Sequence, residues 1–194
     1  MASKYPSWNP YTYTLNNPLN NIDPNGLWTD PINNPTYRGF YGAGKTRNWS
    51  PNKSEFGLVR NNNSTPHQGV DLTANSGTDL LAVESGKIIF AGERGKLGQT
   101  VMLEFKKDDK TKIATYSHMK EINVKEGDTV SEGNIIGTSG KSGNAEELPD
   151  DQAHVHFEIR TKKDAGKGLK NRENPADYMK IKVPEKPKDE KEEK

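Results

Sequence analysis

The clearest alternation of apolar and polar positions lies near the end of the chain, over residues 153–160. The apolar positions of this stretch are Ala153, Val155, Phe157 and Ile159. A period of two predicts a half-buried β-strand, in which residues i and i+2 share a face. The polar face carries His154 and His156, so we expect two imidazoles to project side by side from a rigid support. Such a pair suits metal binding or proton transfer.

Short apolar runs bounded by glycines and turn residues recur from residue 55 onward. They predict strands over 56–60, 69–73, 80–83, 86–92, 100–105, 112–117, 126–130 and 134–138. A polar loop is expected over 61–66, a hairpin turn over 106–111, and a final helical turn over 174–179. We also expect 126–130 and 134–138 to pair across a turn. Repeated strands without helical spacers predict a mainly β fold, a small antiparallel β-sheet or β-sandwich-like domain.

The segments on either side of these strands differ in texture. Residues 28–54 are rich in turn formers and aromatics, which predicts an irregular extension that either packs over a groove of the domain as an inhibitory cover or extends its core. Residues 184–194 are charged and, after Pro184, lack apolar side chains, which predicts a disordered tail. The predicted organisation is therefore a segment 1–27, an extension 28–54, a domain 55–183 and a tail 184–194.

Composition narrows the possible functions. The chain has 194 residues, 30% apolar residues and a formal net charge of +1 from 28 basic and 27 acidic residues, which suits one domain with tails and argues against a nucleic-acid partner. There is no cysteine, so a transition-metal site must use histidine with aspartate or glutamate. We expect no membrane span and no signal peptide, so that export would require a dedicated machine.

The four histidines are the candidates for chemistry. They are His67, His118, His154 and His156. His67 and Asp71 are four residues apart in a β-like stretch, with Gly69 between them giving room for close backbone approach. A catalytic zinc site needs three nitrogen or oxygen ligands and one open position. That count is met by His67, Asp71 and one histidine of the 154/156 pair. Two imidazoles then remain for proton transfer. A His-x-x-x-Asp spacing alone, however, is often a surface coincidence.

Residues 55–179 resemble the lysostaphin/LytM-type zinc metallopeptidases. The matching motifs, in the order of that family, are Phe56-Gly57 with Arg60, His67-x-Gly69-Val70-Asp71-Leu72, Ser85-Gly86-Lys87-Ile88, Tyr116-Ser117-His118-Met119, 124–127, 130–133, Ile136-Gly137 and His154-x-His156-Phe157-Glu158-Ile159. The resemblance implies a small antiparallel β domain with a groove, one zinc ion held by His67, Asp71 and His156, and a catalytic pair of His118 and His154. It further implies a monomeric endopeptidase that cuts peptide bonds of peptidoglycan, without indicating which bond.

Two stretches depart from the pattern of that family. Residues 141–152 form a longer and more acidic segment than usual, with Glu146, Glu147, Asp150 and Asp151. Such a segment is either a specificity element beside the site or a tolerated surface insertion. Residues 95–99 also differ from the usual turn. Both departures concern substrate preference and leave the metal ligands intact.

Residues 1–27 resemble the end of the core of RHS-repeat proteins. The matching pieces are Asn16-Asn17-Pro18-Leu19 and Asp23-Pro24-Asn25-Gly26-Leu27. The resemblance implies that a toxin domain begins after residue 27, delivered by an RHS-type secretion apparatus, acting in the target periplasm or cell wall and countered by an immunity protein. The alternative is a turn-rich leader without this meaning.

Two other functions compete with a zinc endopeptidase. One is a non-catalytic LytM-like module that binds or activates a cell-wall hydrolase, which is disfavoured because all expected ligands are present. The other is an RHS toxin that attacks nucleic acid, which the charge balance disfavours.

Overall fold

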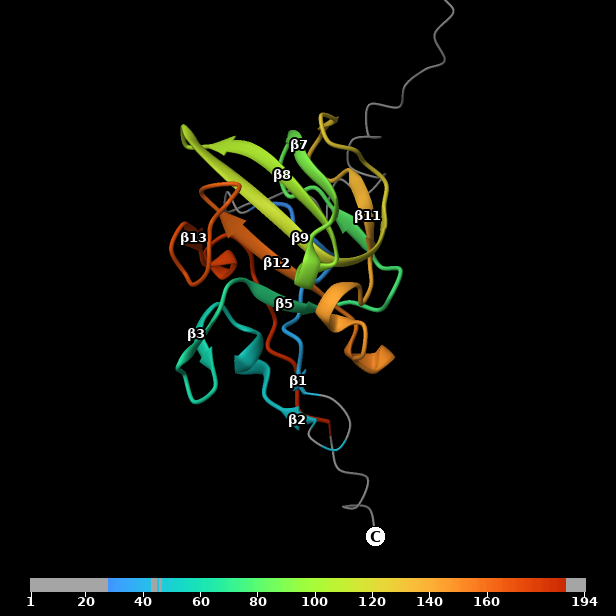
Figure 1. Ribbon diagram of the computed structural model, residues 1–194, viewed down its shortest axis with the longest axis vertical. Helices are drawn as coiled ribbons and strands as arrows, with labels where there is room; N and C mark the ends of the chain where they lie inside the picture. Colours follow the sequence, from blue (N-terminus) through green and yellow to red (C-terminus); the bar gives the residue numbers. More distant parts are fainter. Residues whose placement is uncertain (1–27, 43–44, 46, 188–194) are drawn as a thin grey trace, which may run out of the picture.

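The longest strand among the described residues, β9 (Lys110–Ile122), runs through the middle of the main sheet (Figure 1). The structure is a computed structural model that describes residues 28–42, 45 and 47–187. The main sheet follows the order β10-β7-β8-β9-β11-β6, and β12 joins it by pairing with β9, β5 and β13. All of these pairs are antiparallel, which confirms the predicted mainly β, antiparallel architecture.

The other strands are β1 (Phe40–Tyr41), β2 (Asn48–Trp49), β3 (Gly57–Arg60), β4 (Thr65–His67), β5 (Val70–Thr73), β6 (Asp79–Leu81), β7 (Gly86–Glu93), β8 (Gln99–Lys107), β10 (Thr129–Val130), β11 (Ile135–Ser139), β12 (His154–Arg160) and β13 (Arg172–Glu173). Within the described residues, every helix is a single 3₁₀ turn. These are η3 (Pro51–Ser54), η4 (Gly95–Leu97), η5 (Gly143–Ala145), η6 (Asp150–Gln152) and η7 (Pro175–Asp177). None of them is long and apolar enough to cross a bilayer.

Strand β9 changes partner part-way along its length. Its residues 113–117 pair with β12, whereas Met119 and the residues after it pair with β11. The change occurs at His118, which has a φ of 62°, a left-handed backbone conformation that residues other than glycine rarely adopt. The register of β9 against β8 shifts over the same stretch. A bulge of this kind re-aims a side chain, and here it sets the direction of the His118 imidazole.

Strand β12 is buried on both faces, so the prediction of a half-buried strand is wrong. All seven of its residues are buried. Val155 and Phe157 face the apolar core as expected, but the polar face is also buried, under partner side chains that include His67 of β4 and Arg172 of β13. The alternation therefore marks a polar interior rather than a surface exposed to water.

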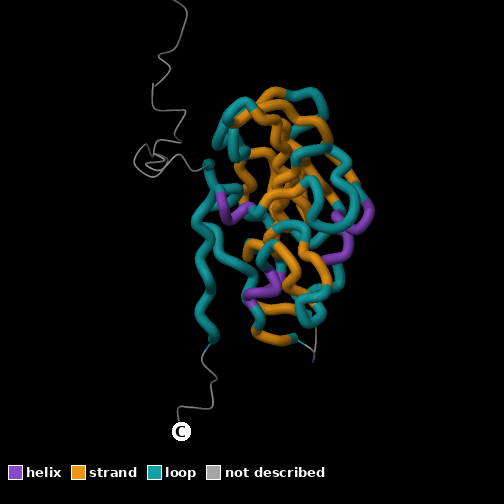
Figure 2. The backbone as a smooth tube through the Cα atoms, turned by 90° about the vertical axis from the view of Figure 1, so that its left-hand side faces the viewer, coloured by secondary structure: helices purple, strands orange, loops and turns teal. Residues whose placement is uncertain are grey.

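The extension before residue 55 contributes to both the core and the sheet. Trp28, Ile32 and Tyr37 belong to the main hydrophobic cluster, and Tyr37 bridges Leu72 of β5 in antiparallel fashion. Thr36 and Lys182 form a further bridge, so the extension and the C-terminal segment run side by side along the domain (Figure 2). The extension contains the very short strands β1 and β2, extends the core and does not form a separate layer over it.

Two local predictions are wrong. The runs at 126–130 and 134–138 do not pair with each other: β10 pairs with β7, and β11 pairs with β6 and β9. Closeness in sequence does not determine the partner when other strand edges are available. Residues 65–66, predicted as loop, lie in β4, which pairs with β3. The predicted segment 1–27 and residues 188–194 of the predicted tail lie outside the described residues.

We expect Trp28→Ala to lower the free energy of unfolding by about 3–5 kcal/mol, as for other buried large-to-small changes. Trp28 is 4% exposed, its ring stacks on Tyr178 with centroids 4.0 Å apart, and it meets Phe105 edge-on. Urea unfolding measures the change. Leu58→Ala is the control, because Leu58 is 53% exposed and its truncation should change stability by no more than about 0.5 kcal/mol. Equal stability of the two variants would contradict the assignment of the extension to the folded domain.

Candidate metal centre and active-site pocket

Three strands bring His67, Asp71 and His156 to one point. His67 ends β4, Asp71 lies on the following β5, and His156 lies on β12. Asp71 and His156 are direct partners in the antiparallel register, so their side chains leave the sheet on the same face. Between β4 and β5, Gly69 lies so close to β12 that a Cβ there would be 2.3 Å from the carbonyl oxygen of Phe157. Glycine at this position allows the turn that carries His67 over Asp71.

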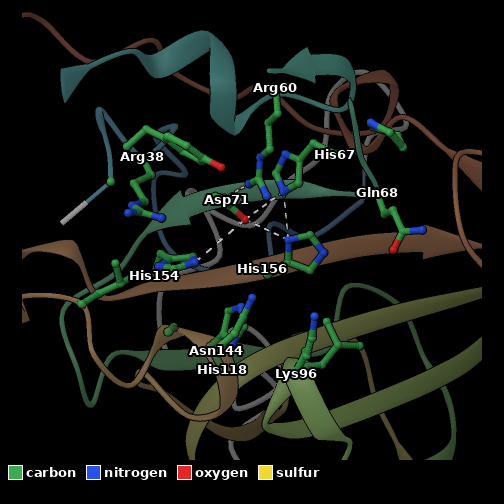
Figure 3. A pocket seen from close by; sticks show the side chains of 16 residues that line it. Arg38, Arg60, His67, Gln68, Asp71, Lys96, His118, Asn144, His154 and His156 are labelled. Atoms are coloured by element: carbon green, nitrogen blue, oxygen red, sulfur yellow. Dashed lines mark hydrogen bonds and ion pairs between the residues drawn. The ribbon is translucent and has the colours of Figure 1, made fainter. Parts of the chain in front are cut away.

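The ligand atoms of these residues form a small triangle. Nε2 of His67 lies 3.1 Å from Oδ1 of Asp71 and 3.1 Å from Nδ1 of His156, and that Nδ1 lies 2.8 Å from the same oxygen (Figure 3). Donors held about 2.0–2.1 Å from a tetrahedral zinc ion are about 3.3 Å apart, so the triangle is close to one face of such a site. Among the described residues, these three form the group that can hold a metal ion. Two imidazoles and one carboxylate are a donor set of the zinc type.

Neighbouring groups orient each ligand. Nδ1 of His67 lies 2.8 Å from the backbone oxygen of Glu55, and Nε2 of His156 lies 3.2 Å from the carboxylate of Glu158. Each imidazole can therefore donate its N–H away from the centre and keep the other nitrogen as a ligand. The second oxygen of Asp71 accepts a hydrogen bond of 2.7 Å from Arg60. These contacts leave Oδ1 of Asp71 and one nitrogen of each histidine facing the same point.

Glu158 is itself held by two arginines. Arg160 donates to both of its oxygens, at 2.8 and 2.9 Å, and Arg172 donates to one of them at 2.7 Å. The side chains of all three residues are nearly inaccessible to solvent. A buried carboxylate is stable only when paired in this way, so the polar face of β12 carries a complete network behind the candidate ligand.

The electrostatics of the cluster favour a cation. Burial alone would lower the pKa of His156, but its hydrogen bonds to Asp71 and Glu158 outweigh burial and raise the pKa to about 9. Burial would raise the pKa of Asp71, yet the charges of His67 and His154 and the hydrogen bonds from His156 and His67 hold it well below its usual value. Asp71 is therefore a carboxylate at neutral pH, and positive charge is stabilised beside it.

His118 and His154 lie next to the triangle without belonging to it. Their ring centroids are 5.0 Å apart, and Nε2 of His154 is 4.0 Å from Oδ1 of Asp71. Nδ1 of His118 lies 2.8 Å from the backbone oxygen of Ser142, and Nδ1 of His154 lies 2.9 Å from that of Gln152. A neutral imidazole that donates from Nδ1 has its lone pair on Nε2, so both rings can present an acceptor to the pocket.

Burial keeps both of these rings neutral. It lowers the pKa of His118 to about 4 and the pKa of His154 to about 3. Nearby positive groups, chiefly His156 for His118 and Arg38 for His154, lower them further against the attraction of Asp71. Near pH 7 both imidazoles are therefore able to accept a proton.

A pocket of about 430 Å³ joins all five side chains. One wall comes from the extension and β3 to β5, and the opposite wall comes from η4, η5 and the residues that follow η5 (Figure 3). Asn144, Ala145 and Leu148 are the part of the 141–152 segment that lines it. The acidic residues of that segment do not line the pocket, and Asp150 and Asp151 pair with Lys141 and Arg47 instead.

Two residues near the centre were not among the predicted site residues. Arg38 lies in the extension, outside every motif, and lines the pocket. The part of Glu158 in orienting a ligand was also not predicted, although its place two residues after His156 on a strand puts both side chains on one face. That spacing was the available signal.

Comparisons with known proteins agree with this geometry. Residues 65–167 match the sequence model of Peptidase family M23. Lysostaphin of Staphylococcus simulans is 38% identical over 98 residues, which are 50% of this chain and 18% of that protein. Glycyl-glycine endopeptidase ALE-1 of Staphylococcus capitis is 36% identical over 101 residues, covering 51% of this chain and 26% of that protein. The chain thus spans about a fifth to a quarter of the length of these relatives.

The fold is also found among solved structures. The catalytic domain of lysostaphin from Staphylococcus simulans aligns with 64% of this chain and 87% of that domain, at a TM-score of 0.52 and 29% identity. The match to the family model covers more than half of the 194 residues and includes all five histidine and aspartate side chains of the pocket. The chain belongs to peptidase family M23, with the His-Asp-His metal centre of a zinc metallopeptidase.

Proposed function

We propose that this chain is a zinc-dependent endopeptidase that hydrolyses peptide bonds of bacterial peptidoglycan. The observation that carries the proposal is the triangle of His67, Asp71 and His156 at the base of a pocket, with two neutral imidazoles beside it. Support for peptide-bond hydrolysis comes from the match to Peptidase family M23 and from a relative named as an endopeptidase. All three candidate metal ligands are present, which argues against a non-catalytic module that only binds or activates another hydrolase.

In the proposed mechanism, zinc would be held by His67, Asp71 and His156. When bound, it supplies a Lewis acid that polarises a carbonyl group and lowers the pKa of water to about 7. The remaining chemistry belongs to His118 and His154. Either ring can accept a proton at Nε2 from the attacking water, because Nδ1 is engaged by a backbone carbonyl.

The protonated ring then becomes an N–H donor at Nε2. In that form it can stabilise the developing oxyanion or pass its proton to the leaving amine nitrogen. The backbone bonds at Nδ1 hold each ring in one orientation during these steps. The bulge at His118 and the buried position of His154 fix them further, so both act as preorganised groups rather than mobile side chains.

We further propose that the peptidase is the toxin part of an RHS-type effector, acting in the target periplasm or cell wall. The support is the sequence of residues 1–27 alone, which resembles the end of an RHS core. A delivery apparatus and an immunity protein are the partners that this proposal requires.

We expect His67→Ala and Asp71→Ala to lose both bound zinc and activity, because each removes one of three ligands. His118→Ala should keep one zinc per chain and lose about 10²- to 10⁴-fold in turnover, as is typical for removal of a general acid or base. Metal analysis and peptide release from purified peptidoglycan measure the two effects. An active Asp71→Ala variant would overturn the ligand assignment.

Chelation should abolish peptide release from peptidoglycan, and added zinc should restore it. Zinc that binds only the folded protein stabilises it by about 2.7 kcal/mol at a free concentration one hundred times its Kd, so thermal unfolding should occur at a lower temperature after chelation. Binding to the wall with no release, in the presence or absence of a chelator, would instead support the non-catalytic alternative.

Expression of the full chain with an added export signal should arrest growth of a bacterial host, whereas expression in the cytoplasm should not. The substrate lies outside the cytoplasm, so the site of action decides toxicity. His118→Ala in the exported chain is the matched control and should be harmless. Equal growth with the exported wild type and the exported His118→Ala variant would contradict the toxin proposal.

A further inference from the structure

Arg38 is a buried cation in the wall of the pocket. Its residue is 6% exposed, and its side chain belongs to the pocket lining together with His154 and Asp71. In Figure 3, Arg38 and His154 lie on one side of Asp71, and His156 and Gln68 lie on the other. Arg38 therefore marks one end of the pocket, next to the candidate catalytic pair.

Backbone pairing determines where this arginine points. Its N–H donates to the carbonyl oxygen of Asp71 at 2.8 Å, and the neighbouring Tyr37 is the direct antiparallel partner of Leu72. Arg38 is consequently opposite Asp71, and residues opposite each other in an antiparallel pair project to the same face. Because Asp71 in turn faces His156, the three side chains form one row across neighbouring strands.

The guanidinium group has few partners of its own. In the described part of the chain it donates one hydrogen bond, of 2.6 Å, to the side-chain oxygen of Gln152. Its Nε is buried and has no acceptor among the described residues, and the same is true of the amide nitrogen of Gln152 and of Nε of Arg47. Arginine stays protonated under all ordinary conditions, so a buried positive charge lies here beside unpaired donors.

The charges of the pocket wall also favour an anionic ligand. The lining includes three cationic side chains, Arg38, Arg60 and Lys96, and one carboxylate, Asp71. Arg60 pairs with Asp71, and Lys96 is exposed to solvent. A divalent ion at the metal centre adds further positive charge. Burial of an unpaired charge is costly, and a planar guanidinium is best matched by the two oxygens of a carboxylate.

We propose that Arg38 forms a carboxylate-binding subsite of the pocket, so that the preferred peptide carries a free carboxylate close to the scissile bond. This inference rests on the proposed peptidase function and specifies its substrate class. Cross-linked stem peptides carry such carboxylates on side chains and chain ends, whereas the interior of an oligoglycine bridge has none. Arg38 is a specificity-determining residue in this assignment.

The test compares two forms of one cross-linked stem peptide, with free carboxylates and with the same groups amidated. We expect the wild-type zinc protein to show a kcat/KM about 10- to 100-fold higher for the free form, as for loss of a charge-assisted hydrogen bond. Arg38→Gln should remove this preference through a higher KM for the free form, since a carboxylate that takes no part in bond cleavage is bound equally in ground and transition states.

Controls separate this role from a structural one. Arg94→Gln removes an arginine that pairs with Asp164 and does not line the pocket, so it should keep the full preference. Arg38→Lys keeps the charge without the planar fork and should keep a weaker preference. If Arg38→Gln does not fold, the weaker preference expected of Arg38→Lys for the peptide with free carboxylates tests the proposal instead. Loss of the preference in Lys96→Gln but not in Arg38→Gln would overturn the proposal.

A binding measurement separates failure of the subsite from failure of the peptidase assignment. Calorimetry with zinc-loaded His118→Ala should show tighter binding of the peptide with free carboxylates than of the amidated peptide. The double variant His118→Ala/Arg38→Gln should bind both peptides equally. If the wild type cleaves both forms equally, the subsite is refuted and the peptidase function stands. If it cleaves neither but binds the free form through Arg38, the peptidase function fails and the subsite stands.

Discussion

The pairing of β5 with β12 places Asp71 opposite His156, and the pocket depends on this register. Side chains on a strand alternate between faces, so a slip of one residue would turn His154, His156 and Glu158 toward the apolar core. The buried carboxylate of Glu158 makes such a slip very unfavourable, because it would lose its partner Arg172 on β13 and turn toward the apolar core together with Arg160. The network behind the metal centre therefore holds the ligands in place as well as orienting one of them.

The sequence predicted which histidine and aspartate side chains meet in the pocket better than it predicted their surroundings. Alternation over 153–160 indicated the strand and the paired imidazoles, because a period of two is a local property of the chain. The pairing of β10 and β11 with other strands could not be predicted in this way, because partners depend on contacts between distant segments. Strand β4 was missed because Thr65 and Pro66 follow a run of polar residues and pair only with the equally short β3.

Arg38 shows the same limit more clearly. Nothing in the residues around it suggests a role, and its position follows from a backbone hydrogen bond to Asp71, thirty-three residues later in the chain. The extension that carries it also places Trp28 against Tyr178. One segment thus supplies part of the core and part of the pocket wall, although the match to peptidase family M23 begins only at residue 65.

Strand β5 has neighbours on both edges, β12 on one and the stretch around Tyr37 on the other. The outer edge is satisfied by the N–H of Arg38, which donates to Asp71, and by the carbonyl oxygen of Thr36, which accepts from Thr73. A fragment cut to the family boundary would lose this cover and leave an open β edge directly beside the metal ligands. Open edges recruit strands from other molecules, so a fragment that keeps this edge covered must include residues well before the family boundary.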